Sequence, residues 1–83
     1  MHVEWQGDHK MLGDDVKRDF EGELKKLGFD PSNFLVEVRR EPDVEGAYNV
    51  FISDLAHPEK DTWKLPGGKG KNWIEQLSKI VRR

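Results

Sequence analysis

Hydrophobic residues recur at helical spacing in one segment of the chain. Over residues 14–27 the apolar side chains follow one another at intervals of four, four and three residues, namely Val16, Phe20, Leu24 and Leu27. This spacing places them on one face of a helix. Gly28 follows directly and offers the left-handed conformation that commonly ends a helix. We therefore predict a helix over residues 14–27 with one buried face.

A period of two replaces the helical spacing further along the chain. Residues 34–40 and 48–54 alternate apolar and polar positions, and a loop with proline and glycine at residues 42–46 separates them. Two such runs predict an antiparallel hairpin. Residues 62–65 resemble a short third strand, and residues 73–82 return to helical spacing, which predicts a second amphipathic helix.

This order of elements predicts the fold class. Two helices and three strands, each with one apolar side, bury those sides most simply as two layers. We expect an α+β domain with a three-stranded antiparallel sheet and two helices on one face, in the order α-β-β-β-α. Residues 1–13 show no sustained period, so we expect a flexible N-terminal arm before a single domain at residues 14–83.

Charge is divided unevenly between the two ends of the chain. The net charge of −2 over 83 residues combines seven bases and fourteen acids in residues 1–59 with seven bases and two acids in residues 60–83. A split of −7 and +5 can mark a one-sided surface for a partner, or two segments that complement each other within the fold.

Composition and spacing exclude several classes of function. With no cysteine the chain suits a reducing compartment, so we expect a cytoplasmic protein. No apolar run is long enough for a membrane helix, and the three histidines lack metal-ligand spacing. No nucleophile motif or acid–base pair stands out, so we expect neither an enzyme nor a bound cofactor or metal.

Two surfaces are candidates for binding. Residues 66–71 form a glycine-rich basic loop before the second predicted helix, where backbone N–H groups and lysines can hold an anion. The alternative is that these residues only connect the strand to the helix, with the lysines keeping the loop soluble, and bind no ligand. The candidate anion or nucleic-acid site comprises Lys64, Gly67, Gly68, Lys69, Gly70, Lys71 and Lys79. The second surface is an apolar pair on the open sheet face, Leu35 and Phe51, suited to a protein partner or a homodimer.

The sequence resembles double-stranded-RNA-binding domains, which share the order α-β-β-β-α. The likeness spans roughly residues 14–82 and is carried by residues 34–42 (FLVEVRREP), 48–52 (YNVFI) and 67–71 (GGKGK). In that family lysines at the second helix contact phosphates, and the hairpin loop and first helix contact minor grooves. The resemblance implies a phosphate role for Lys69 and Lys71.

A weaker likeness is to HicA-type messenger-RNA interferase toxins, which have the same compact fold. It is carried by the residues before the third strand, His57-Pro58, and by the run at residues 65–71. That family has a catalytic histidine in a Gly-Ser-His motif, where this chain has Gly46-Ala47-Tyr48. We therefore expect a binding domain that contacts RNA or another anionic partner. The alternative is protein interaction or self-association through the open sheet face.

Overall fold

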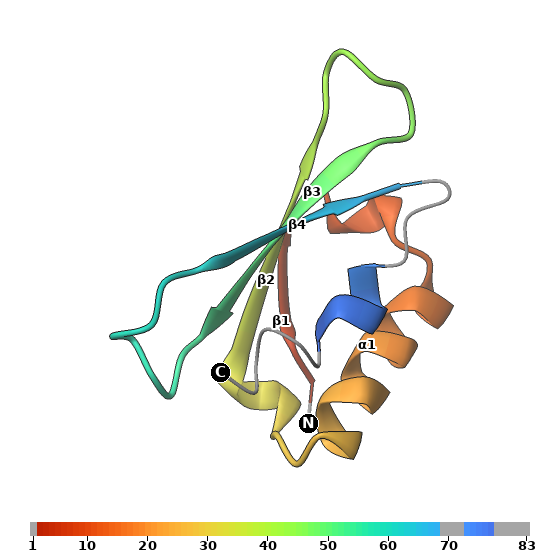
Figure 1. The fold of residues 1–83 in the computed structure, drawn as a ribbon. Helices are drawn as coiled ribbons and strands as arrows, with labels where there is room; N and C mark the ends of the chain where they lie inside the picture. The colour runs from red at the N-terminus through yellow and green to blue at the C-terminus, as the bar shows by residue number, and fades with distance from the viewer. Residues whose placement is uncertain (1, 69–72, 78–83) are drawn as a thin grey trace.

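A computed structural model describes residues 2–68 and 73–77 of the chain. Within these residues, one α-helix and short 3-10 turns pack against a four-stranded sheet (Figure 1). The elements, in chain order, are β1 (Glu4–Gly7), η1 (His9–Met11), α1 (Asp14–Lys26), η2 (Pro31–Asn33), β2 (Phe34–Arg40), β3 (Tyr48–Asp54), β4 (Trp63–Gly67) and η3 (Trp73–Gln76). The α+β class predicted from the sequence is confirmed.

The predicted first helix is present as α1. Phe20 and Leu24 are fully buried on its inner face. The helix ends in a Schellman arrangement around Gly28, which has a φ of +91°. The amide of Gly28 donates to the carbonyl of Lys25, and that of Phe29 donates to the carbonyl of Leu24. These bonds satisfy carbonyls that the end of a helix otherwise leaves unpaired.

The predicted hairpin is also present, and its register sets the core. β2 and β3 are antiparallel, with Val36 opposite Ile52 and Val38 opposite Val50. All four of these side chains are fully buried. β4 continues the antiparallel pairing, with Leu65 opposite Val50, and extends to Gly67, two residues beyond the predicted end. β4 is an edge strand, so Pro66 within it removes no donor that a further strand would need.

The sheet has a fourth strand that the sequence pattern does not predict. Residues 4–7 form β1, parallel to β2, with Trp5 beside Val36. The expectation of an arm at residues 1–13 outside the domain is therefore wrong for this segment, and the three-stranded antiparallel sheet becomes a four-stranded mixed one. Val3 is buried, and the Trp5 ring lies edge-on to Phe20 with centroids 5.5 Å apart. One inward side chain in four residues gives too little alternation to predict a strand.

The second predicted helix is described only at its start. Residues 73–76 form a 3-10 turn, and the rest of the predicted helix, residues 78–82, lies outside the described residues. Trp73 and Leu77 are buried, and the centroid of the Trp73 ring lies 5.3 Å from the centroid of the Phe20 ring. α1 and η3 lie on the same side of the sheet (Figure 1). Among the described residues, no helix covers the other face of the sheet (Figure 1).

Candidate binding surface on the open sheet face

The glycines of the predicted anion loop are explained by packing. Gly67 is buried, and a Cβ at this position would overlap the ring of Tyr48. The hydroxyl of Tyr48 in turn accepts a hydrogen bond from Trp73 Nε1 at 3.3 Å. Gly68 has a φ of +126°, and an added Cβ would lie 3.0 Å from the carbonyl oxygen of Gly46. Steric and conformational demands therefore account for both glycines without a ligand.

The remaining residues of the predicted anion site separate into two groups. Four of them, Lys69, Gly70, Lys71 and Lys79, lie outside the described residues. Lys64 is described, and it lies on β4, which includes most of the strand predicted at residues 62–65. Its Cα partner on β3 is Phe51, so both side chains emerge on the open face. The structure thus brings together one residue from each of the two predicted surfaces.

The ring of Phe51 is flanked by two cations. The guanidinium carbon of Arg39 lies 4.8 Å from the ring centroid, and Lys64 Nζ lies 5.9 Å from it. Such contacts between a cation and an aromatic ring are worth roughly 0.5–1 kcal/mol each at exposed sites. Arg39 comes from β2 and Lys64 from β4, so three neighbouring strands build the cluster around a ring on the central one.

An acidic side chain completes this cluster. Glu37 is the Cα partner of Phe51 on β2, and its Oε1 lies 3.1 Å from Arg39 Nη2. Both side chains reach solvent, with 37% of Glu37 and 64% of Arg39 exposed. We call the four residues Glu37, Arg39, Phe51 and Lys64 the Phe51 cluster. Its formal charge is +1, with both cations beside the aromatic ring.

Leu35, the other predicted interface residue, lies elsewhere on the same face. Its Cα partners are Glu4 on β1 and Ser53 on β3. Leu35 and Phe51 are both half-buried. Among the described residues, the large apolar side chains with most exposure are instead Val44 at 54% and Leu55 at 51%, in the loops before and after β3. The open sheet face therefore presents an aromatic ring with cations rather than a broad apolar patch.

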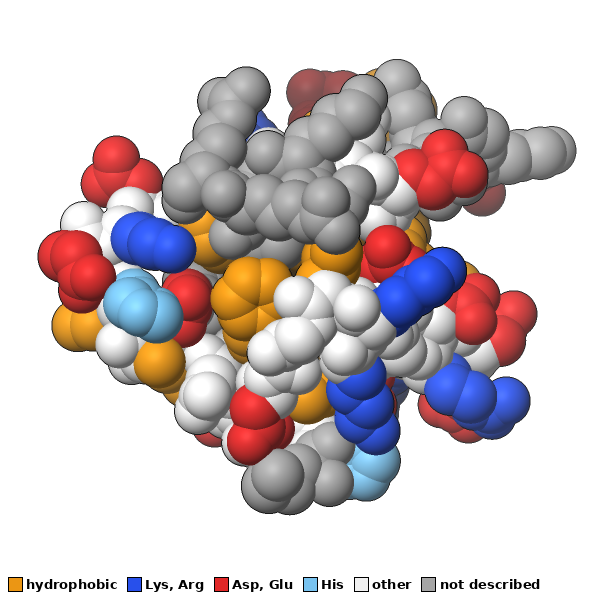
Figure 2. Space-filling model, turned by 60° about the horizontal axis from the view of Figure 1, so that its bottom comes forward, with side chains coloured by type: hydrophobic (Ala, Val, Ile, Leu, Met, Phe, Trp, Pro, Cys, Tyr) orange, Lys and Arg blue, Asp and Glu red, His pale blue; other side chains and the backbone are white. Residues whose placement is uncertain are grey.

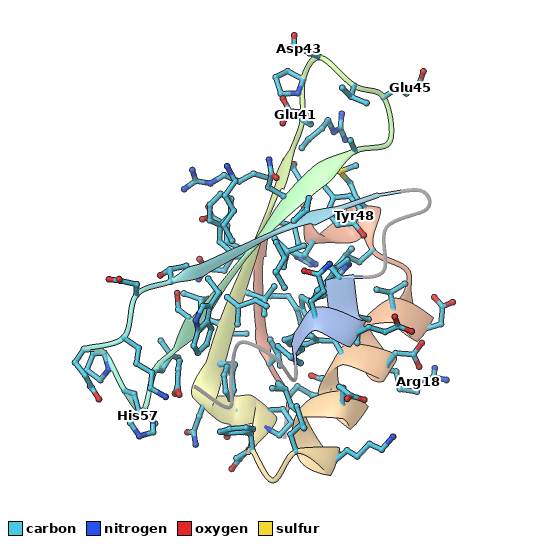
Figure 3. All side chains as sticks on the ribbon, viewed as in Figure 1. Arg18, Glu41, Asp43, Glu45, Tyr48 and His57 are labelled. Atoms are coloured by element: carbon cyan, nitrogen blue, oxygen red, sulfur yellow. The ribbon has the colours of Figure 1, made fainter. Side chains whose placement is uncertain are left out.

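A buried carboxylate lies at the end of β3. The side chain of Asp54 is 3% exposed and accepts hydrogen bonds from the Ala56 amide at 3.1 Å and, at 2.9 Å, from His57 Nδ1. These bonds close the turn after β3, which Figure 3 shows at His57. The contacts of Asp54 with Ala56 and His57 therefore stabilise this turn.

The opposite end of the hairpin is acidic. Glu41, Asp43 and Glu45 lie around the hairpin tip in Figure 3. They line an open groove of about 570 Å³ that also includes Met11 and Arg40. Acidic side chains at this tip disfavour contact with a polyanion. In Figure 2, which shows another face, acidic and basic side chains are mixed around a hydrophobic centre.

Glu37 and Arg39 are functional candidates that the sequence reasoning did not select. Their outward orientation follows from the alternation of β2, and their proximity to Phe51 follows from the hairpin register. Among the described residues, no group of three His, Cys, Asp or Glu side chains is placed to hold a metal ion. None of the helices in this part of the chain is long and apolar enough to cross a membrane.

Comparisons with known proteins add no family to this description. No family model, curated protein or solved structure matches the chain.

Proposed function

We propose that the open sheet face binds single-stranded RNA through the Phe51 cluster. Proteins that bind single strands combine aromatic side chains, on which bases stack, with cations that follow the phosphate backbone. The observation that carries the proposal is the position of Phe51 between Arg39 and Lys64, on three neighbouring antiparallel strands of the mixed sheet. In this role Phe51 supports a base, and Lys64 neutralises a neighbouring phosphate.

The charge distribution supports a single strand rather than a duplex. In double-stranded-RNA-binding domains the hairpin loop contacts a minor groove. In this chain the corresponding loop carries Glu41, Asp43 and Glu45, which a duplex backbone would repel. A single strand lying across β2, β3 and β4 avoids that loop. The proposal is a binding role in the cytoplasm, with no reaction assigned.

The expected contributions follow from the two kinds of contact. Base stacking on an aromatic side chain is worth roughly 1–3 kcal/mol, or about 5- to 150-fold in affinity. Each phosphate neutralised on a single strand adds about −0.7 to the slope of log K against log salt. Loss of the Phe51 ring should therefore weaken binding at all salt concentrations. Loss of the Lys64 charge should weaken binding and also flatten its salt dependence.

Fluorescence anisotropy with a short labelled RNA of mixed sequence tests the proposal. Phe51→Leu keeps an apolar side chain on the sheet but removes the aromatic face, and Lys64→Ala removes the cation. Lys26→Ala is the matched control, because Lys26 is an exposed lysine at the end of α1. We expect weaker binding in Phe51→Leu and Lys64→Ala, and wild-type binding in Lys26→Ala, with thermal unfolding used to confirm that each variant folds.

Two outcomes would overturn the proposal. One is the absence of RNA binding by the wild-type protein at low salt. The other is binding that all three variants retain equally. Concentration-dependent sedimentation without a response to RNA, abolished by Phe51→Ser, would favour the alternative of self-association through Leu35 and Phe51.

A further inference from the structure

The Arg39 guanidinium occupies a small receptor formed by two side chains. Its carbon lies 4.8 Å from the centroid of the Phe51 ring, and its Nη2 lies 3.1 Å from Oε1 of Glu37. Phe51 and Glu37 are direct partners across β2 and β3. Side chains at such positions have Cβ atoms only about 5 Å apart. Together they offer a flat apolar surface and, at its side, a carboxylate that accepts hydrogen bonds.

This receptor matches a planar group that carries adjacent N–H donors. An ionised carboxylate accepts hydrogen bonds and donates none. Guanine presents N1–H and the exocyclic N2 amino group side by side, bonded to one carbon, which is the same planar arrangement as in a guanidinium. Adenine and cytosine place a ring-nitrogen acceptor beside their amino donor, and uracil places a carbonyl on each side of its N3–H. Only guanine therefore offers a carboxylate two adjacent donors without a facing acceptor.

We propose that the Phe51 cluster selects guanine, which replaces the Arg39 guanidinium beside Glu37. This inference rests on the proposed single-stranded RNA binding. In the free protein the Arg39 guanidinium occupies the place that the base takes in the complex. When the base binds, the Arg39 side chain moves away from Glu37 toward a phosphate of the RNA. The exchange costs little free energy because the Glu37–Arg39 ion pair that it breaks is exposed to solvent, and exposed ion pairs contribute little to stability. Glu37 is thus the residue that determines specificity.

The surrounding side chains leave room for this exchange. Arg39 is 64% exposed and lies near the outer end of β2, so its long side chain can move without disturbing the core. Across the sheet, Gln6 lies opposite Glu37 on β1, and Lys64 lies opposite Phe51 on β4. Two further acids reach this face: Glu4 is opposite Leu35, one pair along the strands, and Glu41 accepts a hydrogen bond from Asn49, so neither is directly opposite Phe51. Glu37 is therefore the acidic side chain directly opposite the stacking ring within the described residues.

Four uridine-rich RNAs that differ only in one central base, G, A, C or U, test the inference. The wild-type protein should bind the RNA with guanine about tenfold more tightly than the others, as expected of a good bidentate contact to a base. Glu37→Gln should lose this preference, because an amide replaces one acceptor oxygen with a donor. Glu4→Gln is the matched control: it removes the same charge from the same face and should keep the preference.

The outcomes separate this inference from the proposed function. Equal binding of the four RNAs by the wild-type protein, with binding still lost in Phe51→Leu, would overturn guanine selection and leave the RNA-binding proposal intact. An equal loss of preference in Glu37→Gln and Glu4→Gln would also overturn it, since charge alone would then explain the effect. No RNA binding at all would overturn both proposals.

Discussion

Alanine substitution at two glycines should change stability in opposite directions. At Gly67 a Cβ would overlap the Tyr48 ring, which is held by its hydrogen bond to Trp73. At Gly22, on the exposed side of α1, nothing lies within 4 Å of the added atom. The same chemical change, one methyl group, therefore meets a packed ring at one position and solvent at the other.

The magnitudes follow from this difference. Overpacking costs about 1–3 kcal/mol, and displacing Tyr48 adds about 1 kcal/mol for its hydrogen bond to Trp73. Gly67→Ala should therefore lower the free energy of unfolding by about 2–4 kcal/mol. Gly22→Ala should raise it by about 1 kcal/mol, because alanine favours a helix interior by that amount over glycine. For a domain of this size, each 1 kcal/mol shifts the melting temperature by roughly 4–8 °C.

Urea unfolding followed by tryptophan fluorescence measures both changes, with Trp73 close to the perturbed contact. Repeating Gly67→Ala in a Tyr48→Ser background supplies the decisive control. Without the ring, the added methyl group should cost little, so the two substitutions should be strongly coupled. Wild-type stability in Gly67→Ala would refute the packing of Tyr48 against Gly67. A full cost retained in the Tyr48→Ser background would refute Tyr48 as its cause.

Two further predictions concern single carboxylates. Glu21 accepts a hydrogen bond from the Val3 amide at 2.7 Å, so Glu21→Ala should speed amide hydrogen exchange in β1 more than in the other strands. Asp19→Ala, at an exposed position of the same helix, is the control and should leave this exchange unchanged. Unchanged exchange in Glu21→Ala would contradict this role. Hydrogen bonds from the amide and then the hydroxyl of Ser32 lower the pKa of Asp30. Its contribution to stability is therefore present above the unfolded-state pKa and is lost as the pH falls through the lowered folded-state pKa. An NMR titration should show a partial rise of the Asp30 pKa in Ser32→Ala, and an unmoved midpoint would exclude the hydroxyl.

Local patterns predicted the elements that have their own periodicity. α1 has three apolar residues at helical spacing, with Leu27 continuing the spacing directly after it, and β2 and β3 alternate over seven residues each. β1 has four residues and one inward side chain, so its own sequence holds too little signal. Its pairing depends on contact with β2 some thirty residues later, as Glu4 beside Leu35 shows. Such non-local contacts are what a reading of local periodicity misses.

Two residues of the candidate site, Phe51 and Lys64, were predicted from the sequence, but on two different surfaces. Alternation placed Phe51 on the open face, but Lys64 was grouped with the basic loop that follows it in sequence. Its position beside Phe51 depends on the register of β3 and β4, which the intervening polar loop does not fix. Gly67 suggested an anion loop because a glycine that exposes its amide and one that makes room for a neighbouring ring look alike in sequence. The position of the Tyr48 ring in the structure shows that Gly67 has the second role.

The two edges of the sheet also bear on how the protein avoids aggregation. β2, with three buried side chains, would be an exposed hydrophobic edge if β1 did not cover it. β1 is short and ends at Gly7, whose φ of +70° directs the chain away from the strand. On the other side, β4 carries Lys64 and Pro66, two residues that hinder the addition of a strand from another molecule. Residues 4–7 thus act as a polar cover that keeps β2 from pairing with other chains while leaving the open face free for a ligand.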